Sequence, residues 1–529
     1  MDTATVTATV MAMAMAAMTR RRPEPRHLLL ALAAVTVAAH AQQSAPTSGT
    51  TARPRISLSQ AWTDNLNLDA HDKDAALITT VSPGISITSN SGAVRGVLDY
   101  SLNGITYVKS NQRSQLQNAL TATGQAEIVP RTFFVDAQAS IGQESASAFG
   151  LQAPPTMNPQ GGISSLANNN RREIGVLSVS PSLRGQIGGV ALVDLRGTAS
   201  VTEVRGSSLG DSHSNGVTLR VAQLNPSLLS WYALASMQRT TSAEATSNRS
   251  TSVTAGATYR PDPDWVLSAN AGHESSDYLN GGAEQQSGFT GGVTADWSPS
   301  PRTRLSANWQ KHQYGDSRGL NFEHRMARSV WRLSDSNSVM LGNAGSGGGV
   351  RTNYELYYLL FASQEPDPVK RDQLVRSFLQ SAGLSPDAPA STGFLSTGPS
   401  RMHNQSLSFA LQGVRSNITA LVSRFVTSRL GVGLNQGDLA NSARIEQRSY
   451  SLSASHQLTP TSSVALTASR QETSGDSTNL RTQLTSLTAN WNARLNPRLS
   501  AQLGARHSRF EGVTAYSENA AYANLTQQF

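Results

Sequence analysis

The chain of 529 residues contains no cysteine. This absence excludes disulfide staples, thiolate chemistry and cysteine-bound metal. The sequence also contains no run of eighteen or more apolar residues, which is the length that a membrane-spanning helix needs. A helical membrane protein is therefore excluded, although a protein that crosses a membrane with strands is not.

Charged residues are also sparse, at 15% of the chain, and aromatic residues make up 6%. The formal net charge is +8, with 43 Lys and Arg against 35 Asp and Glu. A basic surface of this size suits contact with an anionic polymer or with lipopolysaccharide, but it also suits many proteins that bind neither. The charge alone therefore favours no partner.

What the sequence has in abundance is alternation of apolar and polar residues with a period of two. In 265–271 the odd positions are Trp, Leu, Ala and Ala, whereas the even positions are Val, Ser and Asn. The segments 304–310, 450–455 and 499–506 alternate in the same way, and each polar face consists of Ser, Asn, Gln, Gly and Arg. Such alternation is typical of β-strands that have one apolar and one hydrophilic face.

Compact proline turns separate these strands, as at Pro83, Pro130 and Pro497. Short turns alternate with longer loops rich in Gly, Ser and Asn, such as 242–249, 274–286 and 475–480. This is the layout of an outer-membrane barrel with short periplasmic turns and long outer loops. We therefore predict an all-β fold, a transmembrane antiparallel β-barrel of about 18–22 strands, in the outer membrane of a Gram-negative bacterium.

The first 41 residues read as a signal peptide. Arg20, Arg21, Arg22 and Arg26 form a basic region, an apolar core follows, and residues 39–41 match a small-x-small cleavage site. The stretch before Met18 has no role in such a leader, so translation is expected to begin at Met18. A short linker at 42–52 and a barrel at 53–529 complete the predicted organisation.

Two segments interrupt the pattern of short strands and turns, and both are predicted to be long loops: 144–171 and 342–402. The second contains one expected helix, at about 367–383. Pro368 suits its first position, Gly383 suits its end, and residues 374–382 form an apolar stripe. We expect this helix to pack at the rim or in the lumen of the barrel.

Aromatic residues near strand ends fit the interfacial girdle of a membrane barrel, although an ordinary core could also hold them. These residues are Trp62, Tyr259, Trp265, Trp297, Trp331 and Trp491. The final strand closes on Phe529, which we interpret as the signal read by the barrel-assembly machinery. Outer-membrane lipids and that machinery are therefore expected partners, and nucleic acid is not.

The sequence offers little chemistry of the kind that enzymes use. Residues Gly206–Gly210 have the spacing of a nucleophile elbow around Ser208, but a strand–turn–helix context is missing. The ten histidines show no paired metal spacing. We therefore predict a non-enzymatic protein with no catalytic residues, no metal and no cofactor.

Arginines on the predicted polar faces are the candidate functional residues. They would either brace the wall through ion pairs with Asp99, Asp194 and Asp296 or line a path for an anionic glycan. The arginines are Arg95, Arg196, Arg220, Arg304, Arg494 and Arg506.

Three segments resemble a known family. They are Trp62-Thr-Asp-Asn-Leu-Asn-Leu68, the block from Tyr354 to Arg371, and the closing strand that ends at Phe529. In these segments the chain resembles an outer-membrane β-barrel family associated with PEP-CTERM/exosortase systems. Gln527 departs from the terminal strand pattern, in which an apolar residue is commoner there. The resemblance brings no catalytic residues.

The resemblance implies a role beside exopolysaccharide synthesis and export. The expected function is thus export or surface organisation of exopolysaccharide, with the polysaccharide and its export proteins as partners. Two alternatives stay open: a structural or surface-display barrel with a plugged lumen, and a general diffusion porin.

Overall fold

A computed structural model of the chain describes 49–108, 110, 112–154, 166, 168–207, 210–242, 247–279, 285–340, 358, 361, 371, 375, 394–396, 399–430, 437–477 and 480–529. The predicted signal peptide and most of the predicted linker lie outside these residues. Of the predicted helix at 367–383, only Arg371 and Val375 belong to them, and both are helical.

The described residues form twenty-two strands and one short helix. The first eleven strands are β1 (Thr50–Thr63), β2 (Ala76–Asn90), β3 (Val94–Val108), β4 (Gln115–Val129), β5 (Phe133–Ser145), β6 (Arg171–Ile187), β7 (Ala191–Val204), β8 (Ser212–Gln223), β9 (Leu229–Ser242), β10 (Ser247–Tyr259) and β11 (Trp265–Ser276).

The second half continues with β12 (Gln286–Ser300), β13 (Thr303–His312), β14 (Gly315–Arg325), β15 (Ser329–Met340), β16 (Ser400–Gln412), β17 (Ser416–Arg429), the helix α5 (Asp438–Asn441), β18 (Arg444–Thr459), β19 (Ser462–Ser474), β20 (Arg481–Asn496), β21 (Leu499–Glu511) and β22 (Tyr516–Gln528).

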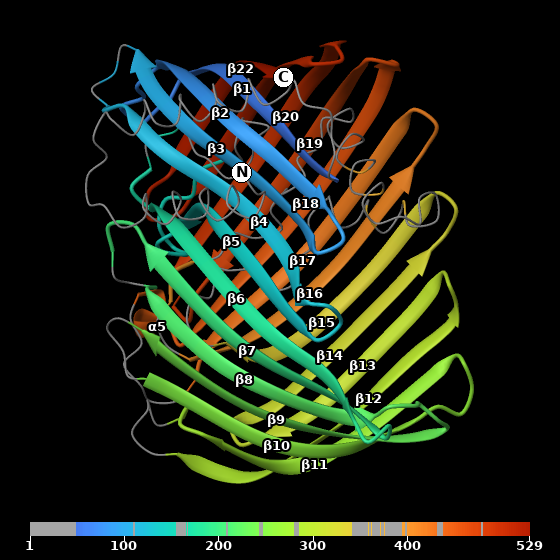
Figure 1. The fold of residues 1–529 in the computed structure, drawn as a ribbon. Helices are drawn as coiled ribbons and strands as arrows, with labels where there is room; N and C mark the ends of the chain where they lie inside the picture. Colours follow the sequence, from blue (N-terminus) through green and yellow to red (C-terminus); the bar gives the residue numbers. More distant parts are fainter. Residues whose placement is uncertain are drawn as a thin grey trace.

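Each strand pairs in antiparallel fashion with its neighbours in the sequence, and β1 also pairs with β22, from Arg55 opposite Gln528 to Thr63 opposite Ala520. In Figure 1 the tilted strands follow one another around the wall, with the first beside the last. The sheet is therefore closed and has no edge, which confirms the predicted antiparallel barrel within the expected range of strand number.

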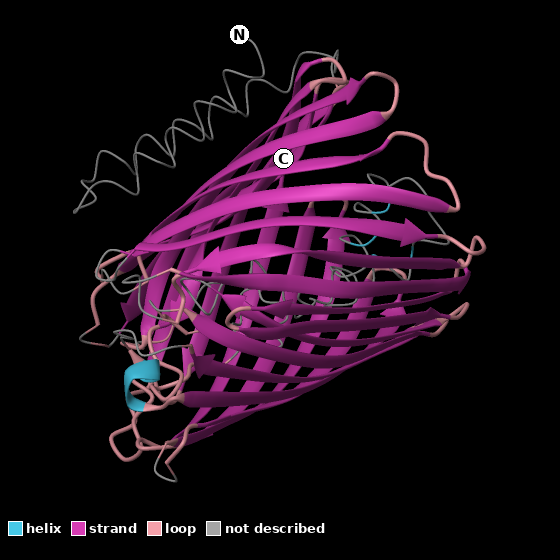
Figure 2. Ribbon diagram, turned by 90° about the horizontal axis from the view of Figure 1, so that it is seen from below, coloured by secondary structure: helices cyan, strands magenta, loops and turns pink. Residues whose placement is uncertain are grey.

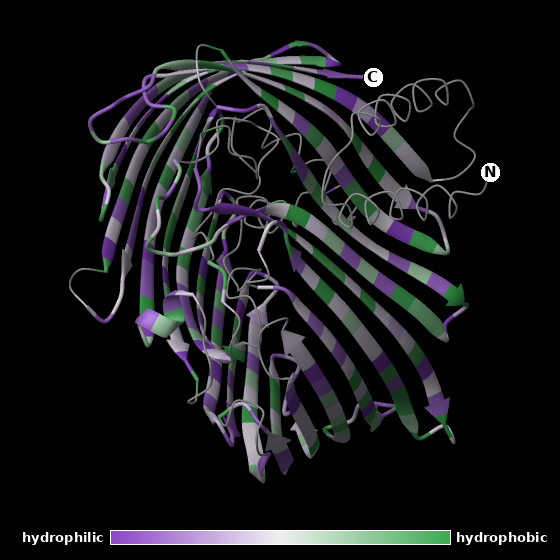
Figure 3. Ribbon diagram, turned by 90° about the vertical axis from the view of Figure 1, so that its left-hand side faces the viewer, coloured by the Kyte–Doolittle hydropathy of each residue, from purple (hydrophilic) through white to green (hydrophobic). Residues whose placement is uncertain are grey.

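The two faces of the wall are inverted relative to a soluble protein. Leu452, Leu466 and Leu503 are about half exposed, at 53%, 50% and 51%, whereas Ser57 and Ser453 are buried at 3% and 5%. Figure 3 shows the resulting alternation of hydrophobic and hydrophilic residues along the strands. Apolar side chains point outward and polar ones inward, so the barrel is stable where hydrocarbon surrounds it. The protein is an outer-membrane barrel.

Aromatic side chains occupy the outward face as the sequence predicts. Trp62, Tyr259 and Trp331 are between 41% and 47% exposed. Trp265 and Trp297 face each other across β11 and β12, with ring centroids 5.9 Å apart. Both lie beside the turns that end these strands, where an amphipathic ring is stable at headgroup level.

The two ends of the barrel differ in their connections. Ten turns of two to five residues join strands at one end, whereas loops of two to 59 residues join them at the other. By the architecture of such barrels the first is the periplasmic turn end and the second is the outer loop end. The helix α5 lies at the loop end (Figure 2). Among the described residues no helix is long and apolar enough to cross a bilayer.

Some element bounds differ from the sequence expectations by a few residues. The strand β1 begins at Thr50, inside the predicted linker, because residues 50–52 pair with Ile87, Thr88 and Ser89 of β2. The predicted long loops span 146–170 and 341–399, so Ser400 to Met402 belong to β16.

The junction of β1 with β22 carries a buried ion pair. The Arg506 guanidinium lies 2.6 Å from the Glu518 carboxylate, and their side chains are 2% and 0% exposed. Thr63 Oγ1 donates a further hydrogen bond to Glu518 at 3.0 Å. This pair therefore links β21, β22 and β1 inside the wall.

The loop after β1 covers the same junction. Asn65 is fully buried and donates from Nδ2 to the backbone oxygens of Asp69 and Ser517, at 2.7 and 3.0 Å. Leu66 and Leu68 are buried beneath it, and Leu68 has φ 56°, a left-handed conformation that costs about 1–2 kcal/mol in a branched residue. The segment Trp62–Leu68 thus packs over the junction of β1 with β22.

Replacing Glu518 with Ala should destabilise the folded barrel by about 3–5 kcal/mol, because it removes one partner of a buried ion pair. Urea unfolding in detergent micelles measures this loss. The matched control is Glu511→Ala on β21, whose pair with Arg509 is 2.9 Å long but exposed; its loss should cost about 0–1 kcal/mol. Equal stability of the two variants would contradict the role of the buried pair.

Candidate functional site

Four of the six candidate arginines lie on the lumen face close to the turn end. Arg95 and Arg304 are the second residues of β3 and β13, and Arg220 and Arg494 lie three and two residues before the ends of β8 and β20. Taken in sequence order around the barrel, these arginines lie on β3, β8, β13 and β20. Neighbouring members are therefore five, five and seven strands apart, and five strands separate the last from the first. They therefore form a widely spaced ring at the periplasmic end, which we call the arginine ring.

Solvent reaches all four side chains of the arginine ring. Arg95, Arg220 and Arg494 are exposed, and within the described part of the chain none of them forms a side-chain hydrogen bond or ion pair. The side chain of Arg304 is 71% exposed and its guanidinium lies 3.9 Å from the Asp296 carboxylate. The positive charge of the ring is thus largely available to a ligand.

The two other candidate arginines have structural roles. Arg196 pairs with Asp136 across β5 to β7 at 2.8 Å. Arg506 is the buried partner of Glu518 at the β1–β22 junction. Its guanidinium is enclosed at the loop end, which fits the ion-pair role that the sequence analysis kept open beside a glycan path. Alternation alone could not distinguish a solvated lumen residue from a buried one.

Further charged residues that were not among the candidates lie on the same face. Arg55 makes two hydrogen bonds of 2.8 and 2.6 Å to Asp99, and Arg184 lies 3.1 Å from Asp194. The alternation of Arg53, Arg55 and Ser57 with Ile56 in β1 was the signal that could have identified them. Two of the three aspartates named as ion-pair partners are thus paired with arginines that were not candidates.

Arginine is also frequent in the turns beside the ring. Six of the ten turns at this end carry one, and Asp262 and Asp264 are the acidic residues in the same ten turns. The turn end is therefore basic, which favours the approach of anions from that side. The turn arginines are Arg131, Arg260, Arg302, Arg328, Arg415 and Arg498.

The opposite end of the lumen is crossed by part of the loop after β5, residues 146–154, which we call the crossing segment. Tyr516 on β22 donates its hydroxyl to the backbone oxygen of Gln152 at 2.7 Å. On the far side, Ser147 Oγ donates to the Asp438 carboxylate of α5 at 2.8 Å. The helix α5 lies between β17 and β18, and β17 is twelve strands away from β5 around the barrel. The crossing segment therefore joins opposite sides of the mouth at the loop end.

An apolar cluster seals the contact between the crossing segment and the wall. Ala148 packs against Phe394, Phe425, Leu439 and Ile445, all of which are less than 9% exposed. Burial raises the pKa of Asp438 above its usual range, although its bonds from Ser147 and Ala148 oppose this effect. The described residues thus leave the lumen solvated at the turn end and packed at the loop end.

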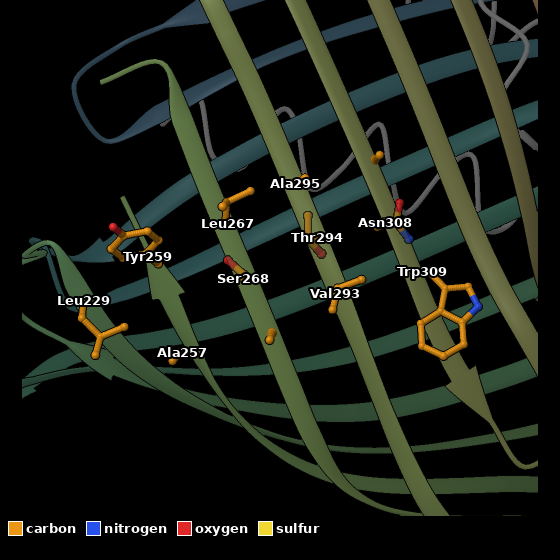
Figure 4. A pocket seen from close by; sticks show the side chains of 12 residues that line it. Leu229, Ala257, Tyr259, Leu267, Ser268, Val293, Thr294, Ala295, Asn308 and Trp309 are labelled. Carbon is orange, nitrogen blue, oxygen red and sulfur yellow. The ribbon is translucent and has the colours of Figure 1, made fainter. Parts of the chain in front are cut away.

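One described hollow lies on the outward face of the wall. It has a volume of about 520 Å³ and lies over β9 to β13 between Leu229, Tyr259 and Trp309 (Figure 4). Its outward lining is almost entirely apolar and includes Ala257, Leu267 and Val293. This hollow faces lipid and offers no polar group for recognition of a soluble ligand.

The remaining chemical candidates stay without support. Residues 206–210 join β7 to β8, so two strands flank them and no helix follows; Ser208 itself lies outside the described residues. No group of three or more His, Asp or Glu side chains within the described ranges could hold a metal ion.

The chain has only distant similarity to known proteins. No family model and no curated protein matches the chain. Among solved structures, the FrpB iron transporter from Neisseria meningitidis is 9% identical with a TM-score of 0.46, and covers 90% of this chain and 81% of its own. The siderophore receptor PirA from Pseudomonas aeruginosa is 8% identical with a TM-score of 0.41, and the match covers 92% of this chain and 81% of the receptor chain.

The outer membrane protein opdK from Pseudomonas aeruginosa is also 8% identical, with a TM-score of 0.31 over 90% of this chain and 99% of its own. At such low similarity these matches assign no ligand and no activity to this protein.

Replacing Asp438 with Ala should release the crossing segment, because it removes the acceptor of the bonds from Ser147 and Ala148. Each hydrogen bond to a charged group contributes about 1.5 kcal/mol or more, so chymotrypsin should cut at Phe149 at least about tenfold faster. The control is Asp72→Ala in an outer loop. An unchanged cleavage rate would show that Asp438 does not hold the segment.

Proposed function

We propose that this protein is a non-enzymatic outer-membrane conduit through which an acidic exopolysaccharide leaves the periplasm. The observation that carries the proposal is the arginine ring, which places four solvated guanidinium groups on the lumen face at the periplasmic end. Rings of Arg or Lys are the usual means by which a pore favours anions.

The chemistry of the ring suits a polymer better than a small anion. A guanidinium binds a carboxylate through two parallel hydrogen bonds, so four separated arginines could hold four acidic sugars along one chain. Between them the wall presents Ser, Thr, Asn and Gln, which exchange hydrogen bonds with hydroxyl groups. Exposure keeps each contact weak, so a bound polymer can still move.

The finer assignment, to exopolysaccharide export in a PEP-CTERM/exosortase system, rests on the sequence resemblance of Trp62–Leu68, Tyr354–Arg371 and the closing strand. In this proposal the export proteins deliver the polymer to the turn end, and the barrel-assembly machinery recognises the strand ending at Phe529.

The crossing segment favours a second candidate, a surface-display barrel whose lumen is plugged. The segment and its apolar cluster close the loop end. In a conduit this closure is a gate that the passing polymer or a partner displaces. In a display barrel the closure is permanent, and the general porin alternative requires a pore that is open at rest.

Planar bilayer recordings distinguish these candidates. The proposal predicts a small current for the native protein, because the crossing segment closes the mouth, and a larger one for Asp438→Ala. Adding alginate, an acidic polysaccharide, to the turn side should block that current. Replacing Arg95, Arg220, Arg304 and Arg494 with Ser should weaken the block by about tenfold or more, since four exposed contacts of roughly 0.4 kcal/mol or more each add up to at least about 1.4 kcal/mol.

Two controls make the result specific. A neutral dextran should block the Asp438→Ala channel equally well with and without the four arginines, and Arg113→Gln, an exposed arginine at the loop end, should keep the full alginate block. A bilayer that stays silent with Asp438→Ala would support the display barrel. Block by alginate that survives removal of all four arginines would refute the arginine ring as the binding element.

A further inference from the structure

Charged residues cover the outward face of β17 to β21 immediately beyond the apolar band. On β18 the outward residues Leu452 and Tyr450 are followed by Arg448, Glu446 and Arg444 toward the loop end. The neighbouring strands change in the same way, with Leu466 followed by Arg470 on β19 and Leu503 followed by Arg509 on β21. The change occurs on adjacent strands, so it forms one continuous surface.

The centre of this surface is a cluster of three arginines around one carboxylate. Glu446 accepts from Arg424 at 2.8 Å, from Arg444 at 3.0 Å and from Arg448 at 2.7 Å. Glu446 is 13% exposed, whereas the three arginine side chains are 34%, 52% and 50% exposed. We call these four residues the outward arginine cluster.

The outward arginine cluster carries more positive charge than its own acid can balance. Three guanidinium groups surround one carboxylate, which leaves two positive charges within the cluster. The register places Glu472 opposite Arg448, but Glu472 pairs with Arg470 at 2.5 Å. The register also places Arg424 directly opposite Arg448, and like charges in that position repel. An anion from outside the chain would stabilise this arrangement.

The location of the cluster indicates which anion meets it. Its residues share the outward face with Leu452, and they lie toward the loop end, beyond the hydrocarbon level. That is the headgroup level of the outer leaflet, where lipopolysaccharide presents the phosphates of lipid A. Arginine binds phosphate oxygens through two parallel hydrogen bonds.

We propose that the outward arginine cluster is a binding site for a lipid A phosphate. Arg444 and Arg448, the two more exposed members, contact the phosphate, while Arg424 stays paired with Glu446 and holds it in place. The acyl chains of the lipid lie along the apolar band beside Leu452 and Leu466. This site is on the outside of the wall and is independent of any transport through the lumen.

The test uses the full-length barrel in detergent and measures lipid binding by native mass spectrometry. Diphosphoryl lipid A should bind the native protein, and Arg444→Gln/Arg448→Gln should bind it about tenfold or more weakly. This variant removes both surplus charges and keeps the Arg424–Glu446 pair. Arg444→Lys/Arg448→Lys should retain much of the binding, and Arg328→Gln/Arg415→Gln at the turn end should retain all of it.

Two further ligands identify the source of the recognition. Dephosphorylated lipid A should bind the native protein only weakly, at the level that diphosphoryl lipid A shows with the Gln variant. Phosphatidylglycerol should not displace bound diphosphoryl lipid A from the native protein. Heat-dependent gel mobility verifies that each variant is folded. Equal binding of both forms of lipid A, equal binding of phosphatidylglycerol, or undiminished binding by a folded Gln variant would each overturn the proposal.

Discussion

The structure depends on the pairing of β1 with β22. A sheet in hydrocarbon cannot leave backbone N–H and C=O groups unpaired, because each such group costs several kcal/mol there. Closure satisfies all of them at once, and it then allows Leu, Val and Trp to face lipid while Ser, Thr and Asn face inward. The buried Arg506–Glu518 pair and the covering loop at Asn65 both lie at this junction, where separation of the first and last strands would reopen the wall.

The two ends of the lumen have opposite character. At the turn end Arg95, Arg220 and Arg494 are solvated and unpaired within the described part of the chain. At the loop end the crossing segment joins β5 to β22 and to α5, with apolar packing around Ala148. A lumen that is basic and accessible on one side and packed on the other suits a conduit that opens on demand.

Much of this fold could be predicted from the sequence, because a period of two and short turns such as those at Pro130 and Pro497 indicate where strands form and which face is apolar. The predicted turn at Pro83 was wrong, since this residue lies within β2 and pairs with Ile56. Trp265 and Leu503 face outward as that pattern requires. The roles of individual arginines could not be predicted, since alternation places Arg304 and Arg506 on one face without showing that one is solvated and the other buried. The crossing segment contacts residues far away in the sequence, such as Asp438. Arg424 and Glu446 lie on separate strands. No local sequence pattern specifies either contact.

The absence of cysteine makes the central claim directly measurable, since a single introduced thiol reports on one position. Asn308 and Val293 lie on neighbouring strands of one wall and on opposite faces, and both are exposed. In liposomes a water-soluble maleimide should label Asn308→Cys and leave Val293→Cys unlabelled, and a lipid-soluble quencher should act only on a fluorophore attached at 293. Labelling of Val293→Cys from water together with lipid quenching at 308 would contradict a barrel with its apolar face in the membrane.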